Sequence, residues 1–123
     1  MYKHNLKVYG EDLLNGSTAG VVKAQGNMGG LVVRVFAKAD AQTVGSTDVT
    51  IKSGDDGENF GTTITVLNVA SATAVEKDDL LAEAILPWDV EKYVTAAAAA
   101  GDDAGTGATA DTNIVVTLGY LPR

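Results

Sequence analysis

The clearest alternation of apolar and polar residues in the chain runs from residue 47 to residue 66. In its first half, Val49 and Ile51 alternate with polar neighbours, and its second half places on one face Phe60, Thr62, Ile64 and Val66. A period of two is typical of a strand that buries one face. The residues between the halves are mostly Gly, Asp and Asn, which favour turns because glycine reaches positive φ and short polar side chains bond nearby amides. The pattern predicts a β-hairpin with an apolar face on each strand.

Two further segments show the same period. The sequence LVVRVFAK at residues 31–38 is rich in β-branched residues and predicts a strand with an inner face of Leu31, Val33, Val35 and Ala37. Its other face is mixed, and Phe36 there either covers its own sheet or meets a partner. Near the end of the chain, NIVVTLGYL places on one face Ile114, Val116, Leu118 and Tyr120. We expect one core to be shared by Val49, Ile51, Ile64, Val116 and Leu118.

The segment EKDDLLAEA at residues 76–84 is compatible with a helical turn, because Asp78 and Asp79 suit a helix start. Proline disfavours helical geometry in the residue before it, and Pro87 follows within three residues. We therefore predict a strand, followed by an extended corner at Pro87 and Trp88. We interpret Trp88, the only tryptophan, as a core or corner anchor, with a ligand platform as the alternative.

The run YVTAAAAA at residues 93–100 combines opposite preferences. Alanine is the best intrinsic helix former, whereas Tyr93, Val94 and Thr95 favour a strand. We predict a strand over Ala96–Ala100 as well, with helix as the alternative. The polar, glycine-rich sequence that follows predicts a loop before the last strand.

A chain of 123 residues forms one domain with a single core. Because all strong patterns have the period of a strand, we predict an antiparallel β-sandwich over residues 1–123, in which residues 1–20 are an N-terminal arm or an edge strand. The net charge of −7 disfavours nucleic acid and anionic membrane surfaces as partners. No apolar run approaches the roughly 20 residues that span a bilayer, and the first residues lack the apolar centre of a signal peptide, so we expect intracellular synthesis.

Few residues of the sequence are candidates for catalysis or for binding a metal or a phosphate group. The chain has no cysteine, and its one histidine, His4, would have to supply any catalytic triad from near a terminus. The acidic turn residues Asp55, Asp56 and Glu58 form an incomplete calcium set, and the carboxylates at residues 76–83 are typical of a hydrated surface. The glycine clusters lack the lysine and the strand-to-helix setting of a phosphate-binding loop. We therefore predict no enzymatic activity, no metal site and no cofactor.

The first ten residues are locally basic in an acidic chain. They combine the cations Lys3 and Lys7 with the apolar residues Tyr2 and Leu6, which suits an acidic neighbouring subunit. We predict a partner interface at these four residues, extended at the other end of the chain by Tyr120 and Leu121. The alternative is that both ends merely close the sandwich.

Two resemblances add to this picture. The pattern Ser53-x-Asp55-x-Gly57-x-x-Phe60 resembles the Asp-box hairpin of sialidases and other β proteins, in which polar residues tie down the turn. Over residues 30–123, the succession of LVVRVFAKA, TDVTIKSGDDGENFGT, ILPWDVEKYV and NIVVTLGYLPR resembles the small cement, or decoration, proteins of tailed-bacteriophage capsids, in particular the jelly-roll type of Bordetella-infecting short-tailed phages.

The second resemblance implies a jelly-roll sandwich that acts as a structural virion protein. Such a protein is made in the host bacterial cytoplasm, assembles with itself as a dimer or trimer, and binds the major capsid protein on the outer capsid surface. A phage tail or fibre component is the nearest alternative. A carbohydrate-binding module is the second alternative, with Trp88 and Tyr93 as its aromatic platform.

Overall fold

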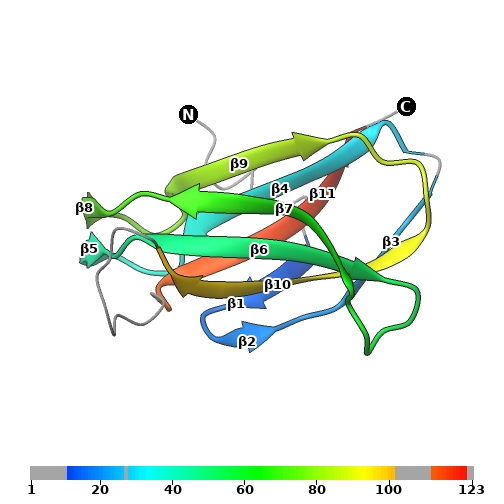
Figure 1. The fold of residues 1–123 in the computed structure, drawn as a ribbon. Helices are drawn as coiled ribbons and strands as arrows, with labels where there is room; N and C mark the ends of the chain where they lie inside the picture. Colours follow the sequence, from blue (N-terminus) through cyan, green and yellow to red (C-terminus); the bar gives the residue numbers. More distant parts are fainter. Residues whose placement is uncertain (1–10, 27, 102–111, 122–123) are drawn as a thin grey trace.

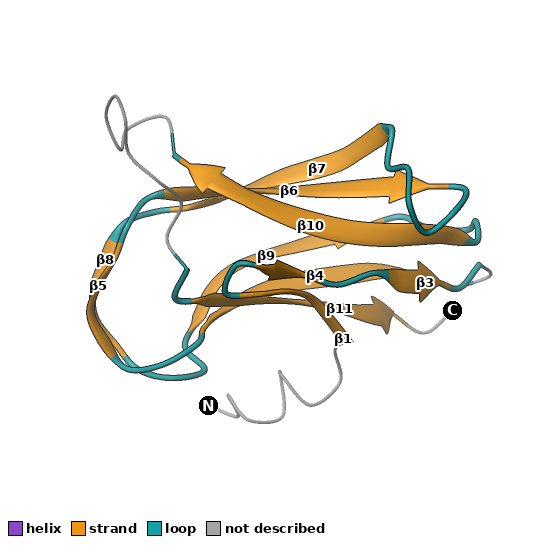
Figure 2. Ribbon diagram, turned by 90° about the horizontal axis from the view of Figure 1, so that it is seen from below, coloured by secondary structure: helices purple, strands orange, loops and turns teal. Residues whose placement is uncertain are grey.

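The computed structural model describes residues 11–26, 28–101 and 112–121. Within these ranges every regular element is a β-strand, and the strands form two antiparallel sheets that pack face to face (Figures 1 and 2). The predicted antiparallel β-sandwich is confirmed. The predicted interface residues Tyr2, Lys3, Leu6 and Lys7, and the predicted loop over residues 102–111, lie outside the described residues.

Two sheets and one short ribbon make up the fold. The five-stranded sheet has the order β2 (Thr18–Ala19), β1 (Glu11–Asn15), β11 (Ile114–Leu121), β4 (Gly30–Ala37) and β9 (Leu80–Leu86). The four-stranded sheet has the order β3 (Val22–Ala24), β10 (Lys92–Ala100), β6 (Thr47–Gly54) and β7 (Thr62–Val69). The ribbon of β5 (Ala41–Val44) and β8 (Ala72–Val75) curves from one sheet toward the other at one end (Figure 2).

The strand order is that of a jelly roll. Apart from β2, β5 and β8, the order β1-β11-β4-β9 faces the order β3-β10-β6-β7, so the first described strand lies beside the last one. Most connections cross between the sheets, and the turns from β1 to β2 and from β6 to β7 join neighbours within one sheet. The β6–β7 turn belongs to the hairpin that the sequence predicts.

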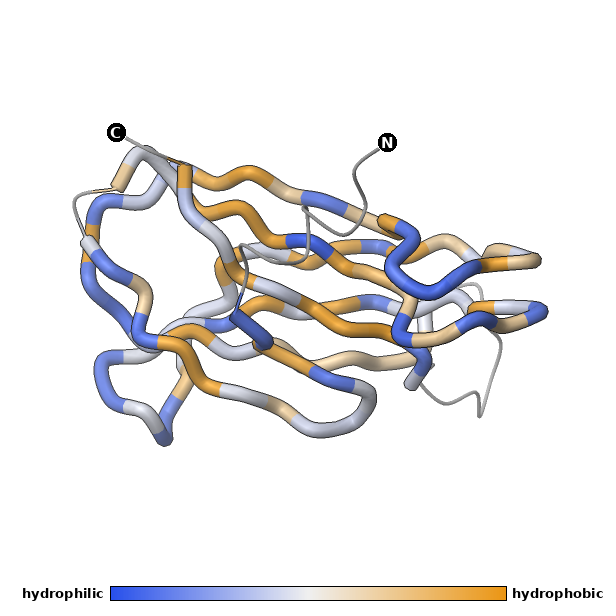
Figure 3. The backbone as a smooth tube through the Cα atoms, turned by 180° about the vertical axis from the view of Figure 1, so that it is seen from behind, coloured by the Kyte–Doolittle hydropathy of each residue, from blue (hydrophilic) through white to orange (hydrophobic). Residues whose placement is uncertain are grey.

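The core lies between the two sheets. Val49, Ile51, Val116 and Leu118 are buried in one cluster, and the partly buried Ile64 packs against it, as predicted. The predicted inner face of β4 joins the same cluster with Leu31, Val33, Val35 and Ala37. Figure 3 shows hydrophobic positions along the strands and hydrophilic ones gathered in the turns. Burying each large aliphatic side chain stabilises the fold by about 1.5 to 3 kcal/mol.

The outer face of the five-stranded sheet also holds buried apolar residues. Phe36 is fully buried, and Val32 and Val115 are nearly so, yet none of them belongs to the cluster between the sheets. Beside them, Arg34 on β4 pairs with Glu83 on β9, with 2.7 Å between Nε and Oε2. Of the two interpretations of Phe36, burial within its own fold is the one observed.

The alanine-rich segment is a strand throughout. Tyr93 to Ala100 on β10 pair in register with residues 47–54 on β6, and Ala96 is buried in the core. The tertiary pairing outweighs alanine's intrinsic preference for helix.

The acidic segment before β9 forms a tight turn rather than a helix start. Asp78 has a positive φ of 69°, and the Asp79 carboxylate accepts a hydrogen bond from the Glu76 backbone N–H at 2.8 Å. The strand predicted after it is confirmed as β9, and Pro87 and Trp88 follow it outside any strand.

One prediction about the hairpin is wrong. The simple alternation placed Val66 on the inner face with Ile64, but Val66 is 46% exposed and the inward residues are Leu67 and Val69. The register shifts between Ile51 and Lys52, whose partners are Thr65 and Thr63, so Ile64 is the extra residue of a β-bulge. A bulge reverses the inward and outward positions of all residues beyond it.

Candidate functional site

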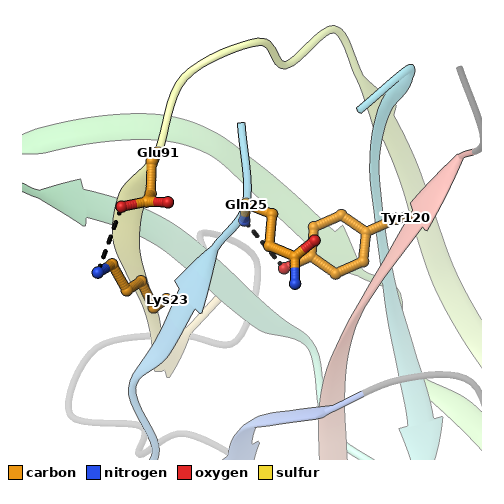
Figure 4. Close-up of polar contacts among 4 residues, drawn as sticks. All are labelled: Lys23, Gln25, Glu91 and Tyr120. Atoms are coloured by element: carbon orange, nitrogen blue, oxygen red, sulfur yellow. Dashed lines mark hydrogen bonds and ion pairs between the residues drawn. The ribbon is translucent and has the colours of Figure 1, made fainter. Parts of the chain in front are cut away.

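The end of β11 is one of the predicted contact points. The side chain of Tyr120 packs against the core, and its hydroxyl accepts a hydrogen bond from the backbone N–H of Gln25 at 3.1 Å (Figure 4). Leu121, the last described residue, is 36% exposed. Tyr120 thus ties β11 to the segment after β3, and Leu121 presents apolar surface at this end.

A small ion pair lies next to this contact. Lys23 on β3 approaches Glu91 with 3.2 Å between Nζ and Oε1, and its Nζ lies 5.6 Å from the centre of the Tyr93 ring. The hydrogen bond to Glu91 and the charge of that carboxylate raise the pKa of Lys23. The two partners come from β3 and from the residue before β10 (Figure 4), so this pair marks a charged, solvent-exposed side of the sandwich.

The opposite side of the sandwich is formed by two long edge strands. β7 ends the four-stranded sheet and β9 ends the five-stranded sheet, and the two strands run along the same side (Figure 1). An edge strand presents unpaired backbone N–H and C=O groups, to which another chain can pair unless charges, proline, a bulge or short length prevent it. β7 has eight residues and β9 has seven, and in an antiparallel pair about every second residue turns its N–H and C=O toward the open edge.

The side chains on this side are unusually apolar. β7 has the sequence TTITVLNV, which contains no charged residue and no proline. Val66 on β7, Leu80 on β9 and Ile85 on β9 are 46%, 40% and 55% exposed. Glu83, the one charged residue of β9, is paired with Arg34. Val66 faces outward from the four-stranded sheet, and Leu80 and Ile85 face outward from the five-stranded sheet. We call these three residues, on either side of the edge formed by β7 and β9, the long-edge surface.

A cleft opens at the end of the sandwich where the β6–β7 turn meets the connection from β9 to β10. It has a volume of about 580 Å³, within the range of ligand sites. Its apolar wall consists of Ile64, Trp88 and Val90, and its polar wall includes Asp55, Asn59, Thr62 and Lys92. The Lys92 ammonium is paired with the Asp55 carboxylate.

The turn that forms one wall of the cleft is held by Asp56. Its Oδ1 accepts hydrogen bonds from the backbone N–H groups of Glu58 at 2.9 Å and Asn59 at 2.7 Å, and its Oδ2 accepts one from the Asn59 side chain at 3.2 Å. These bonds lower the pKa of Asp56, because they favour the charged carboxylate. The Asp-box pattern contains Asp55, whereas the hydrogen bonds that hold this turn are accepted by its neighbour Asp56.

Trp88 is both a corner anchor and part of the cleft. It packs against the core in a partly buried position, as the first interpretation of this residue predicted. Its indole Nε1 is buried and has no hydrogen-bond partner among the described residues, a state that costs about 1 to 3 kcal/mol. Tyr93 does not line the cleft and its ring lies below Lys23, so the structure does not join Trp88 and Tyr93 into one platform.

The long-edge surface was missed from the sequence, although a signal for it is present. Between Glu58 and Glu76 the chain has no charged residue, a run that covers the whole of β7. Within the described ranges, no group of three or more His, Cys, Asp or Glu side chains is placed to hold a metal ion. The same ranges contain no helix long and apolar enough to cross a membrane.

Comparisons of the chain with protein-family models, with curated proteins and with solved structures find no match.

Proposed function

We propose that the chain is a decoration, or cement, protein of a tailed-bacteriophage capsid, without enzymatic activity. It binds the major capsid protein on the outer surface of the shell, in many copies, and stabilises the shell against disruption. Support comes from the resemblance over residues 30–123 and from the jelly-roll strand order. The single observation that carries the proposal is the long-edge surface.

A protein that functions as a monomer needs features that keep its edge strands from pairing with other chains. Natural edge strands avoid pairing with other chains through charged residues, proline, a bulge or short length, and of these β7 has only the bulge at Ile64, near its start. Val66 faces outward from the four-stranded sheet, opposite Thr50, and Ile85 faces outward from the five-stranded sheet, opposite Val32, so a partner reaches both by extending around the edge formed by β7 and β9. A neighbouring protein that covers the two edges would bury apolar area and pair open backbone groups at the same time.

Many identical contacts on the capsid lattice can hold this protein in place even when each single contact is weak. On a symmetric lattice each copy is held by several contacts, and linked contacts raise the effective affinity without any new chemistry. The proposed partners are the major capsid protein and further copies of this chain, as a dimer or trimer. The basic and apolar residues Tyr2, Lys3, Leu6 and Lys7, with Leu121 at the other end, remain the proposed secondary contacts. A tail or fibre component is the alternative that uses the same surface.

The test compares two lysine substitutions on opposite sides of the sandwich. Val66→Lys puts a charge on the long-edge surface, and Val21→Lys puts the same charge beside the short strand β3, at a residue of matching exposure, 48% against 46%. Both variants should keep the wild-type melting temperature, because both side chains are open to solvent. We expect Val66→Lys to bind undecorated shells of the parent phage at least about tenfold more weakly, and Val21→Lys to bind like the wild type.

Two results would contradict the proposal. One is wild-type decoration of shells by Val66→Lys, and the other is absence of the chain from purified virions by mass spectrometry. Presence in isolated tails but not in capsids would favour the tail or fibre alternative.

A further inference from the structure

The cleft beside Trp88 has features that the decoration function does not require. It lies at the end of the sandwich, at the turn between β6 and β7, whereas the exposed apolar residues of the long-edge surface lie along β7 and β9. Its volume of about 580 Å³ exceeds what one or two water molecules occupy and suits a small organic ligand.

The walls of the cleft combine two kinds of surface. Trp88, Ile64 and Val90 supply an apolar wall that includes the only indole of the chain. Asn59, Thr62 and the Asp55–Lys92 pair supply donors and acceptors opposite it. A ligand that fits must therefore offer an apolar face together with several groups that both donate and accept hydrogen bonds.

The charges of the cleft argue against an ionic ligand. The ammonium of Lys92 is already paired with Asp55, and both carboxylate oxygens of Asp56 are occupied by hydrogen bonds from the turn. Two carboxylates against one ammonium leave a negative balance, which disfavours phosphate and other anions.

We propose that this cleft binds a neutral saccharide. The C–H face of a sugar ring is apolar and lies against the Trp88 indole, while its hydroxyls bond Asn59, Thr62 and the exposed atoms of the Asp55–Lys92 pair. Sugar hydroxyls suit this mixed wall because each donates one hydrogen bond and accepts others. On a capsid surface, such a site would attach the particle to glycans.

The turn is built to keep the cleft in shape before a ligand arrives. Three hydrogen bonds hold the Asp56 carboxylate. Gly54 lies so close to the next limb of the turn that a Cβ there would be 1.8 Å from the carbonyl oxygen of Asn59. A preformed wall lowers the entropy that binding has to overcome.

Trp88 makes the experiment direct, because all indole fluorescence of the protein comes from this cleft. The full chain is titrated with methyl glycosides of glucose, galactose and mannose, with N-acetylglucosamine, and with short oligomers of each sugar. We expect a saturable change in Trp88 emission with at least one of these sugars, confirmed by calorimetry. Inorganic phosphate serves as the anionic comparison and should produce no change.

Two neighbouring residues provide matched variants. Thr62 lines the cleft and Thr63 does not, although both are exposed residues at the start of β7. Thr62→Arg should fill the cleft and weaken binding of the selected sugar by at least about tenfold, whereas Thr63→Arg should bind like the wild type. Equal melting temperatures of the two variants exclude a folding defect as the cause.

The proposal is overturned if no sugar gives a saturable change at millimolar concentration, or if phosphate does so and no sugar does. It is also overturned if a sugar binds equally well to Thr62→Arg and to Thr63→Arg, because the ligand then lies elsewhere. None of these results bears on shell decoration, which is measured separately with the Val66 variant.

Discussion

The two sides of this sandwich differ in the length and the composition of their edge strands. On one side the sheets end in the short strands β2 and β3, of two and three residues, and the adjacent Lys23–Glu91 ion pair is solvent-exposed. Beyond β3, residues 95–100 of β10 continue this edge without a partner strand among the described residues. On the other side the sheets end in the eight residues of β7 and the seven of β9, with Val66 and Ile85 open to solvent. Short, charged edges resist pairing with other chains, and long apolar edges invite it. This difference is the basis of the proposal that a partner covers the side formed by β7 and β9.

The largest expected effect is a loss of unfolding free energy, which should be large for a residue of the central strand β6 and small for one of the edge strand β7. Ile51 is fully buried on β6, so Ile51→Ala should lower the free energy of unfolding by about 2 to 5 kcal/mol. Val66→Ala on β7 should change it by no more than about 0.5 kcal/mol. Urea denaturation of both variants measures the contrast. A loss at Val66 as large as that at Ile51 would mean that Val66 serves the fold of the single chain rather than a partner.

The next effect concerns the turn that sets β7 in place. Gly54→Ala would put a Cβ in collision with the carbonyl oxygen of Asn59 and should cost roughly 1 to 3 kcal/mol, as overpacking does. Gly61→Ala is the matched control, because no atom lies within 4 Å of the added Cβ. Thermal melting should therefore show a lower midpoint for Gly54→Ala alone. If the two variants melt alike, the close approach at Gly54 does not fix the start of this edge.

The smallest expected effect is the pH dependence of the stability that the same turn provides. The hydrogen bonds to Asp56 lower its pKa below 3.8 in the folded chain, so their stabilisation is present above that pH and is lost as the pH falls through the lower, folded value. Asp56→Ala should melt slightly below the wild type at neutral pH, and the gap should close in acid. Glu58→Ala keeps the hydrogen bonds to Asp56 and removes one acid from the same turn, so it is the control. A gap for Asp56→Ala that is constant down to about pH 2 would contradict this role.

Much of the fold could be predicted from local pattern. The period of two in residues 31–37, 49–51 and 114–120 identified strands and their inner faces, because these segments are buried on the core side and side chains alternate along a strand. The strand at Ala96–Ala100 was predicted against alanine's preference for helix, and its pairing with β6 gives the physical reason for it.

The register with which β7 pairs with β6 could not be predicted from the sequence. The bulge at Ile64 depends on how β7 pairs with β6, and no local pattern reveals an extra unpaired residue. Val66 was therefore assigned to the inner face, and the uncharged run over β7 was not interpreted as an exposed edge. The strand order is equally non-local, because β7 and β9 become edges only when the order of both sheets is known. The cleft was missed for the same reason, since its walls come from the β6–β7 turn and from the connection before β10.

The most direct test of the account is amide hydrogen exchange on the full chain, measured free in solution and bound to undecorated shells of the parent phage. Exchange reports which backbone N–H groups become covered or paired. We predict that amides of β7 and β9 exchange more slowly on the shell and that those of β2 and β3 do not change. Slower exchange confined to β2 and β3, with β7 and β9 unchanged, would show that the partner binds the opposite side and would contradict the central claim.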